Sequence, residues 1–485
     1  MAQICCHRKV ALQLIQNALD EARRDFKEVG KPLTLKMHDN QHESMLKGVF
    51  SDNSSQQSQK VEMAGIMNLL ILLLVITNIK NIIMSYQQHG FVLSHVIQDY
   101  IRSGVYKVPE NYETISAILT IPIFTAIAFW IEILASNQHT SRHLVFSLIL
   151  LSQVCLLSFP IYVSYHNDSD LILGNLLVML TISTSLKMIS FHHVMHDVRG
   201  LVLRVMKAKK EGRKLEPSKT ERTIFGVDEQ LYEEALTYPK CLHLKHFMRY
   251  TFMPTYCFQL SFPLKEKRDW CLIFKRVVES LIALFLVVYL FYQHIVPVCE
   301  ESVPYFEQGD YFRIMICVFN VSIPGSYIWV MLFYLVFHAW TNLLAECTRF
   351  ADKRFYSDWW NAGNLNEYWR KWNHPIHNWL VRHVYYPLIR RGLSQNVSKL
   401  LTFMVSAAAH EYIVVGTFRV FNMIAFTFML VNAPLMQIQR QLRNVVSKNT
   451  NNLMFWLGYT AIGQPTAILV CYYQTVKKMH APPVA

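Results

Sequence analysis

Residues 143–165 read HLVFSLILLSQVCLLSFPIYVSY, a stretch that contains no Asp, Glu, Lys or Arg. A helix rises about 1.5 Å per residue, so an apolar run of about 20 residues can cross the roughly 30 Å of hydrocarbon in a bilayer. Several runs of similar length follow one another along the chain. They leave too little polar sequence for a large soluble domain, so the fold is predicted to be all-α and polytopic in a membrane.

The composition of the 485 residues points the same way. Hydrophobic residues make up 52% of the chain and charged residues only 17%, whereas a soluble domain usually carries about a quarter charged residues. The net charge of +13 would suit nucleic-acid binding in a soluble protein. Here the basic residues lie in loops between apolar runs, so we expect membrane lipids and no nucleic acid as partners. The ten cysteines form no CxxC pair, which indicates buried thiols rather than a disulfide or zinc framework.

Nine apolar runs are predicted to cross the membrane. The run at 313–350 is too long for one perpendicular crossing, so we expect it to be either strongly tilted or broken near Pro324 and Gly325. The nine predicted spans are 64–86, 114–136, 143–165, 171–193, 274–297, 313–350, 400–421, 423–440 and 453–475.

One orientation satisfies the positive-inside rule throughout. If the N-terminus is cytosolic, the basic loops all lie on the cytosolic side, and the acidic loop 300–310 lies on the opposite side. No cleavable signal peptide is visible, so the first span is expected to act as an uncleaved signal anchor. The predicted parts are a polar, flexible cytosolic tail at 1–62, a transmembrane domain at 63–475 and a short C-terminal tail at 476–485.

The long loop at 351–399 contains an amphipathic pattern. From Ile376 onward apolar residues recur at spacings of three and four, with Asn378 and Arg382 on the opposite face. Asn373 fits an N-cap, and Pro375 suits the first turn, where a missing N–H costs little. Such a helix is predicted to lie at the membrane surface, either in contact with lipid or packed against its own bundle.

The run Leu400–Val415 carries polar residues at membrane depth. Ionisable groups there are costly and usually functional. Ser406 and His410 are four residues apart and share one helix face, whereas Glu411 points about 100° away. The residues alone leave two interpretations of His410: a hydrogen bond between helices, or a group that faces a reaction chamber.

Three further polar patterns are less specific. Phe355–Asn361 reads FYSDWWN, which by composition alone is typical of an interfacial aromatic belt. Gln464 lies within the ninth predicted span, where it either caps freed backbone or meets a polar ligand. His192 and His196 are four residues apart, but no third ligand is evident on their face, so no metal site is predicted.

These motifs together resemble the membrane-bound O-acyltransferase family, in the branch of sterol and diacylglycerol O-acyltransferases. FYSDWWN matches the FYxDWWN signature of the branch, and HEY at 410–412 matches the segment around its catalytic histidine. Flanking blocks agree at 252–263 (FMPTYCFQLSFP) and 337–350 (FHAWTNLLAECTRF). Within the branch, 372–392 (WNHPIHNWLVRHVYYPLIRRG) and 462–470 (IGQPTAILV) are most similar to the acyl-CoA-dependent diacylglycerol enzymes. The resemblance covers the chain from about residue 63 onward.

The resemblance implies an acyltransferase that moves a fatty acyl group from acyl-CoA to the hydroxyl of 1,2-diacylglycerol in the endoplasmic reticulum membrane, giving triacylglycerol. About nine helices would enclose an intramembrane chamber, with amphipathic loop helices on the cytosolic side. A homodimer or homotetramer is expected. No cofactor and no metal are implied, since acyl-CoA is a substrate.

The resemblance also implies roles for individual residues. His410 would be the general base, and Asn373 would help to place the thioester. Two residues depart from the family pattern: Gln395 replaces a basic residue, and Asn432, on the acceptor side, replaces Gln. The acyl-CoA route would be lined by Trp369, His377, Tyr385, Gln395, Lys399 and Ser406, the chamber by Glu411 and Gln464, and the signature motif comprises Phe355, Tyr356, Asp358, Trp359, Trp360 and Asn361.

Two rival functions remain open at this point. A chamber histidine does not select its acceptor, so the same chemistry on a sterol, retinol or long-chain alcohol is the nearest alternative. A lipid transporter or scramblase would also place polar groups at membrane depth. A transporter or scramblase would not explain the FYSDWWN and HEY motifs. The two halves of the sequence also show no inverted repeat.

Overall fold

The computed structural model describes residues 92–137, 139–166, 171–211, 234–442 and 446–479, and a few single positions between 76 and 87. Most of this part of the chain is helical, and its one β-type pairing is an isolated bridge between Leu264 and Phe350. The described residues therefore confirm the all-α prediction. The predicted tail at 1–62 and most of the first predicted span lie outside the described residues.

The chain divides into two compact units. One contains Met1–Ser55, Asp197–Cys241 and Leu260–Pro263, and the other contains Gln56–His196, Leu242–Gln259 and Leu264–Ala485. All of the candidate site residues belong to the second unit.

Six helical segments of the described chain are long and apolar enough to cross a membrane. They confirm six of the nine predicted spans, with ends that differ by a few residues except at the third, which is much longer than predicted. The six segments are Asn111–Ser136, Arg142–His166, Leu173–Lys210, Tyr311–Thr348, Gln395–Phe418 and Thr450–Lys478. The helices that contain the first three of them are α4 (Val92–Ser136), α5 (Arg142–His166) and α6 (Leu171–Lys210).

Two further predicted spans form helices but do not reach the same apolar character. The run at 274–297 is the helix α10 (Trp270–Leu290), which carries Lys275, Arg276 and Glu279, followed by a π-helical turn η1 (Phe291–Ile295). The run at 423–440 is α18 (Ile424–Leu442). Neither is among the segments that qualify as a span by length and composition, so the number nine is not confirmed.

The long apolar run near 313–350 does not break at its proline. The helix α12 (Tyr311–Phe333) continues through Pro324 and Gly325, then passes through a π-helical stretch η2 (Tyr334–Trp340) into α13 (Thr341–Thr348). The alternative of a break at Pro324 is therefore wrong. A helix of this length exceeds the hydrocarbon thickness, so it must tilt or project beyond the bilayer.

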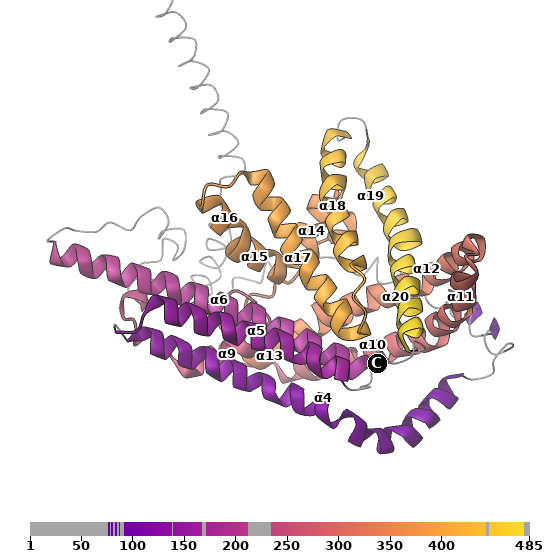
Figure 1. Ribbon diagram of the computed structural model, residues 1–485, viewed down its shortest axis with the longest axis horizontal. Coiled ribbons are helices and arrows are strands. Elements are labelled where there is room, and N and C mark those ends of the chain that lie inside the picture. The colour runs from indigo at the N-terminus through magenta and orange to yellow at the C-terminus, as the bar shows by residue number, and fades with distance from the viewer. Residues whose placement is uncertain are drawn as a thin grey trace, which may run out of the picture. The chain divides into compact units, whose positions relative to one another are not determined.

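The first described helices pack side by side. Figure 1 shows α4, α5 and α6 running next to one another, and Leu177 and Val163 are buried between them together with Ala117 and Ile121. Lys187 of α6 binds the end of the short helix α9 (Leu244–Phe252). Its Nζ donates to the carbonyls of Tyr250, Thr251 and Met253 at 2.5–3.0 Å. One buried ammonium group thus caps the C-terminal end of α9.

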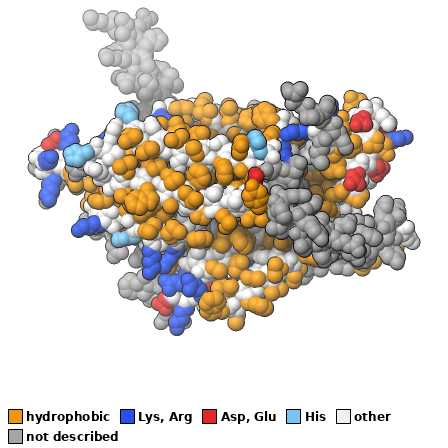
Figure 2. Space-filling model, turned by 60° about the horizontal axis from the view of Figure 1, so that its bottom comes forward, with side chains coloured by type: hydrophobic (Ala, Val, Ile, Leu, Met, Phe, Trp, Pro, Cys, Tyr) orange, Lys and Arg blue, Asp and Glu red, His pale blue; other side chains and the backbone are white. Residues whose placement is uncertain are grey.

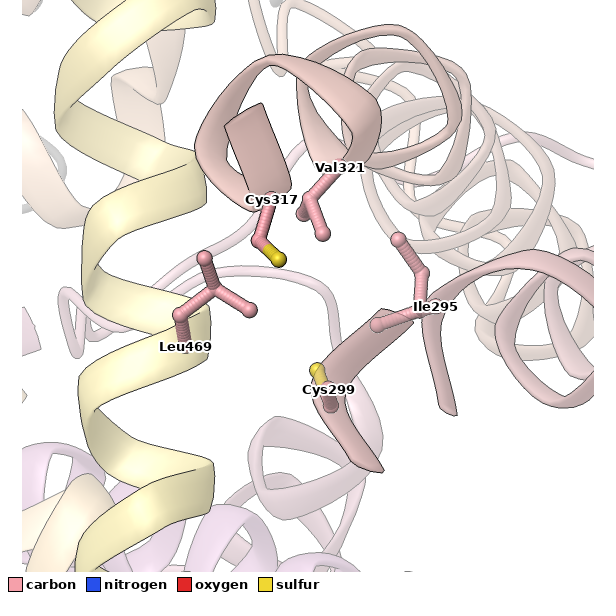
Figure 3. Packing of buried hydrophobic residues seen from close by; sticks show 5 residues of the cluster. All are labelled: Ile295, Cys299, Cys317, Val321 and Leu469. Atoms are coloured by element: carbon pink, nitrogen blue, oxygen red, sulfur yellow. The ribbon is translucent and has the colours of Figure 1, made fainter. Parts of the chain in front are cut away.

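A second core lies where three helical segments converge. Leu469 comes from α20 (Gln464–Met479), Cys317 and Val321 from α12, and Ile295 and Cys299 from η1 and α11 (Val296–Gln308). Figure 3 shows these five side chains pointing into the space between their helices. α20 follows α19 (Lys448–Leu457) through a π-helical stretch η5 (Gly458–Gly463), so the ninth predicted span is continuous but changes its hydrogen bonding just before Gln464.

Large apolar side chains are exposed along the outer faces of the spans. Examples on α4 and α5 are Leu119, Trp130, Phe146 and Leu151, which are between 59% and 71% exposed. Figure 2 shows hydrophobic side chains spread across one face, with most basic and acidic side chains near its ends. Apolar surface of this extent is expected where lipid, and not water, is the solvent.

The long loop between 351 and 394 folds into short helices, as predicted. Its elements are the 3₁₀ turn η3 (Trp359–Asn361), α14 (Leu365–Trp372), α15 (His374–Leu380), the π turn η4 (Val381–Tyr385) and α16 (Tyr386–Arg390), which lead into α17 (Gln395–Phe418).

Candidate active site

His410 lies on α17, and its ring is fixed by the helix itself. The Nδ1 atom is 2.7 Å from the carbonyl oxygen of Ser406, one turn earlier. A carbonyl oxygen can only accept, so Nδ1 must carry the proton of the neutral ring. The Nε2 atom is then the one that holds a lone pair. It has no hydrogen-bond partner among the described residues, and the side chain is exposed in the isolated chain.

One face of α17 carries three of the six residues predicted for the acyl-CoA route, together with His410. Gln395, Lys399, Ser406 and His410 are spaced four, seven and four residues apart, which keeps them within one stripe of a helix. The stripe runs roughly 22 Å along the axis. Phe403 lies on the same side, and its ring is 6.5 Å from that of Trp369 on α14. The stripe therefore faces the short helices of the loop.

The other faces of α17 are anchored to its neighbours. Tyr412 donates from its hydroxyl to the carbonyl of Leu157 on α5 at 2.9 Å. Gly416 approaches α6 so closely that a Cβ atom there would lie 2.5 Å from Cγ2 of Val178. Figure 1 shows α17 next to α16 and α18 on its remaining sides. These contacts fix which way His410 points.

Glu411 is buried and binds backbone. One carboxylate oxygen accepts from the amides of Asn422 and Met423 at 3.3 and 2.8 Å, and the other accepts from the amide of Phe426 at 3.1 Å. The carboxylate thus caps the first turn of α18, where unpaired N–H groups and the helix dipole favour an anion. Both oxygens have backbone partners, so its predicted place in the chamber lining stays a prediction.

The FYSDWWN motif runs beside the junction between α14 and α15. The amide of Ser357 donates to the carbonyl of Lys371, and the amide of His374 donates to the carbonyl of Phe355, both at 2.9 Å. The hydroxyl of Ser357 is also 3.1 Å from Nε2 of His374. These bonds fix the backbone on both sides of Asn373.

An ion-pair chain strengthens the same junction. Lys371 lies 2.9 Å from Asp358 of the motif and 2.7 Å from Glu367. Burial alone would lower the pKa of Lys371, but hydrogen bonds to Glu367 and Asp358 outweigh it and raise the pKa. The side-chain oxygen of Asn364 caps α14 by accepting a hydrogen bond from the backbone amide of Glu367 at 2.8 Å. The motif acid therefore holds the end of α14 in place.

The aromatic residues of the motif lie inside the protein. Trp359 is 5% exposed and packs edge-on against Trp329 of α12 and against Trp372. Trp329 and Trp372 are stacked, with ring centroids 4.8 Å apart and an angle of 8° between the ring planes. The interfacial-belt reading of the motif is therefore wrong, because Trp359 packs in an aromatic core and not at the rim. Among the motif residues, Phe355 and Trp359 are buried, Tyr356, Asp358 and Trp360 are half-buried, and Asn361 is exposed.

A buried polar contact joins the motif to the long span. The hydroxyl of Tyr356 lies 2.6 Å from Nδ1 of His338 in η2, and Arg276 of α10 lies 2.9 Å from Nε2 of the same ring. Burial raises the pKa of Tyr356 to about 12, so the hydroxyl stays protonated. His338 was not predicted as a site residue. A lone histidine within a long apolar run was its only signal.

Asn373 caps α15, as the sequence predicts. Its side-chain oxygen accepts from the amide of Ile376 at 3.1 Å, and Pro375 sits in the first turn. The following helix packs on the bundle at Trp379, which is buried and donates from Nε1 to the carbonyl of Leu186 on α6 at 2.8 Å. Of the two alternatives for this amphipathic helix, packing against its own bundle is therefore found at Trp379.

Three of the predicted residues keep buried polar atoms without a partner in the described chain, and one of them is Trp359 of the motif, through its Nε1. Nε1 of Trp369 is buried and finds no acceptor among the described residues. Oε1 of Gln464 is also buried and finds no donor among them. The amide nitrogen of Gln464 donates to the carbonyl of Gly325 at 3.0 Å. Gln464 thus binds the backbone of α12 through one end and leaves the other end available.

His377 is held neutral by its surroundings. Burial lowers its pKa to about 4, helped by the positive charges of nearby His374 and Arg370. The ring is half-buried and forms no hydrogen bond within the described chain. A neutral imidazole here can donate or accept without adding a charge.

The remaining predicted residues differ in how far the fold engages them. Asn432 on α18 donates to the carbonyls of Phe428 and Met429, so its amide nitrogen is occupied by its own helix. Tyr385 is half-buried in the π turn η4, and Gln395 and Lys399 are exposed in the first turns of α17. The structure therefore gathers His410, Ser406, Lys399 and Gln395 on one stripe, and keeps Asn432 on a different helix.

Comparison with known proteins shows which family this chain resembles. The model of the MBOAT, membrane-bound O-acyltransferase family matches residues 109–472. A protein of Oryza sativa subsp. japonica named diacylglycerol O-acyltransferase 1-2 is 30% identical over 86% of this chain and 83% of its own length. Diacylglycerol O-acyltransferase 1C of Glycine max is 30% identical over 94% and 82%, respectively. Diacylglycerol O-acyltransferase 1 of Arabidopsis thaliana is 28% identical over 88% and 76%.

Proposed function

Since the chain belongs to the membrane-bound O-acyltransferase family, we propose that it transfers a fatty acyl group from acyl-CoA to the hydroxyl of 1,2-diacylglycerol with His410 as the general base. The acyltransferase activity follows from the family, and the diacylglycerol acceptor from relatives of that name along most of the chain. One observation supports His410 as the base: its Nδ1 is bonded to the Ser406 carbonyl, and its Nε2 has no partner among the described residues.

The proposed reaction is a direct transfer. Nε2 of His410 accepts the hydroxyl proton while the hydroxyl oxygen bonds to the thioester carbonyl carbon. The tetrahedral intermediate then expels the CoA sulfur, and the imidazolium returns its proton to that sulfur. The products are triacylglycerol and free CoA, and the histidine ends in its starting form. No covalent enzyme intermediate is required.

The intermediate needs hydrogen-bond donors for its oxyanion, each worth about 3 kcal/mol in comparable enzymes. Two donors are candidates. Nε1 of Trp369 is buried and lacks an acceptor among the described residues. Asn373 accepts through Oδ1, which leaves its Nδ2 hydrogens for a ligand. The bonds between the FYSDWWN motif and the α14–α15 junction would keep both donors rigid.

The acyl-CoA route is proposed to follow the stripe along α17. Lys399, with Arg390 and Arg391 just before α17, would meet the phosphates of CoA, and Ser406 lies one turn from His410. Gln395 contributes no charge there. Tyr385 and His377 would line the side of the route formed by α15 and η4, and Gln464 and Asn432 would serve the acceptor from α20 and α18.

The test of the proposal is the pair His410→Ala and His166→Ala. His166 on α5 forms the same ring-to-carbonyl bond, from Nδ1 to Tyr162, and is also exposed. With purified protein and labelled acyl-CoA, the first variant should lose at least about 10²-fold in kcat, and the second should keep full activity. Near-normal triacylglycerol synthesis by His410→Ala would refute the role of the base.

The acceptor is tested with the same assay. Diacylglycerol, a sterol, retinol and a long-chain alcohol are each supplied with labelled acyl-CoA. We expect diacylglycerol to give the highest kcat/KM. A higher value for any other acceptor would replace diacylglycerol in the proposal, and lipid redistribution without product would favour a transporter.

The cellular setting belongs to the same proposal. We place the protein in the endoplasmic reticulum membrane with its N-terminus cytosolic and as a homodimer or homotetramer. The positive-inside distribution of the loops supports the orientation, and acyl-CoA, a soluble anion, would then enter from the cytosol.

A further inference from the structure

A second cavity, of about 330 Å³, lies away from α14–α18. It opens where the C-terminal ends of α9 and α13 meet the segment before α10. Its lining combines basic and apolar side chains: Arg249, Phe252, Arg268, Leu344, Cys347, Thr348 and Arg349. All of these residues belong to the second unit. None of them is used by the proposed reaction.

The arginines of this pocket have no carboxylate partner in the described part of the chain. Arg268 donates from Nε to the carbonyl of Cys347, and Arg349 donates from Nη1 to the carbonyl of Glu266, both at 2.9 Å. The side chain of Arg249 forms no hydrogen bond within the described chain. Each guanidinium has five N–H donors, so the bonds to the carbonyls of Cys347 and Glu266 use only a small part of the available donors. Most of the positive charge in the pocket is left uncompensated.

The backbone at Arg349 adds a second sign that its side chain is used. Arg349 ends α13 with φ of 63°, in the left-handed region. Glycine or asparagine is the usual residue in this position at a helix end, because a Cβ atom makes the conformation less favourable. An arginine here keeps its guanidinium at the pocket at a cost in backbone energy.

The surroundings of the pocket point to a lipid as the source of the anion. Thr348 is the last residue of the candidate span Tyr311–Thr348, so the pocket lies at one end of a segment that is apolar enough to cross a membrane. On α9, Leu244, Met248 and Phe252 are four residues apart on one face and are 39% to 62% exposed. An exposed apolar stripe next to basic residues is typical of a helix at the membrane surface.

From these observations we propose that the pocket binds the phosphate group of an anionic glycerophospholipid. Arg249, Arg268 and Arg349 would hold the phosphate oxygens, since guanidinium groups bind phosphate in paired hydrogen bonds. Phe252 and Leu344 would contact the first carbons of the acyl chains. The site is independent of the proposed acyl transfer and can be tested by binding alone.

The experiment compares Arg249→Gln with Arg313→Gln in the full-length protein. The side chain of Arg249 has no hydrogen bond in the described chain, so its replacement removes charge without breaking a side-chain contact. Arg313 is an exposed arginine near the start of the span Tyr311–Thr348, at the end away from the pocket, where it pairs with Asp310. Nanodiscs of phosphatidylcholine containing phosphatidylglycerol provide a lipid whose only charge is its phosphate, and native mass spectrometry measures how much is retained per chain.

We expect Arg249→Gln to lower phosphatidylglycerol retention about fivefold, and the combined replacement of Arg249 and Arg268 to lower it further. Arg313→Gln should match the wild type, and retention of phosphatidylcholine should not change. Equal phosphatidylglycerol retention by Arg249→Gln and the wild type would overturn the proposal. Displacement of the lipid from the wild type, but not from Arg249→Gln, by millimolar CoA would also overturn it, because the pocket would then belong to the soluble substrate.

Discussion

At the scale of single residues, the proposed chemistry depends on which nitrogen of His410 carries a proton. Within an α-helix the carbonyl of residue 406 is one turn below the ring, and the bond from Nδ1 sets the tautomer. The backbone of α17 therefore sets the tautomer that the proposed role of His410 requires. Glu411, the next residue, supports a different helix, although it stands beside the histidine in the sequence.

Trp369→Phe should lower kcat/KM about tenfold or more and leave the melting temperature nearly unchanged, because its Nε1–H has no partner in the described protein. Trp379→Phe is the matched control. Its Nε1–H donates to Leu186, so this change should cost about 1 kcal/mol more in free energy of unfolding. Activity assays and thermal melts of both variants check the prediction. Equal loss of stability in the two would contradict it.

His377→Gln should flatten the dependence of stability on pH. The folded pKa of His377 is about 4, because burial and nearby positive charge disfavour the imidazolium. The unfolded chain, with a pKa near 6.5, binds more protons between these values, so wild-type stability rises with pH in that window. The contribution is roughly 3 kcal/mol at most. Melting temperatures from pH 4.5 to 7 should show a smaller slope in the variant, and identical slopes would contradict the assignment.

At the scale of elements, the different faces of α17 make different contacts. One face carries the stripe that ends at His410, another meets α5 and α6, and Glu411 fixes the start of α18. The FYSDWWN motif has a comparable role for α14 and α15. Its contacts are with the backbone around Asn373, so it acts as a support for site residues.

Gly416→Ala should displace α17 from α6, because the new Cβ atom would lie 2.5 Å from Val178, whose branched side chain cannot turn away easily. We expect a loss of about 1–3 kcal/mol in stability together with lower activity. The double variant Gly416→Ala with Val178→Ala should recover part of both. At Gly458 a Cβ atom would meet nothing within 4 Å, so Gly458→Ala should leave the helix packing unchanged. Thermal melts and acyl-transfer assays decide, and absence of rescue would contradict the steric explanation.

At the scale of the whole molecule, exposed apolar side chains and continuous helices fit a multi-pass membrane protein. The span Tyr311–Thr348 begins after the acidic segment 300–310, which was predicted as a loop but lies mostly in the helix α11, and the span ends just before Arg349 of the arginine pocket. The two ends of this span thus differ in charge. This difference is the one that the positive-inside rule uses to orient a chain.

Cysteines introduced at Gln308 and Lys448 should react with a membrane-impermeant thiol reagent from opposite sides. Both positions lie outside the apolar cores of their spans, and the basic loop at 441–452 is predicted to be cytosolic. In intact microsomes Lys448→Cys should be labelled above the wild-type background, and Gln308→Cys only after permeabilisation. Labelling of both in intact microsomes would contradict the orientation.

The sequence by itself determined the membrane class, six of the spans, the cap at Asn373 and the shared face of Ser406 and His410. Each of these depends on residues that are close in the chain, so hydropathy and helical period suffice to predict them. Of the two alternatives predicted for the run at 313–350, the break at Pro324 is wrong, and the reason is local: a proline within a long membrane helix can be tolerated.

Only the tertiary structure decided the contacts between distant segments. Four features join residues that sequence spacing does not relate. They are the packing of Trp359 on Trp329, the bond from Tyr356 to His338, the hydrogen bonds of Glu411 to the start of α18, and the pocket of Arg249, Arg268 and Arg349. Such contacts follow from how helices pack, and side-chain type alone does not specify the partner. The sequence thus determined which groups the membrane contains, and the packing determined which of them meet.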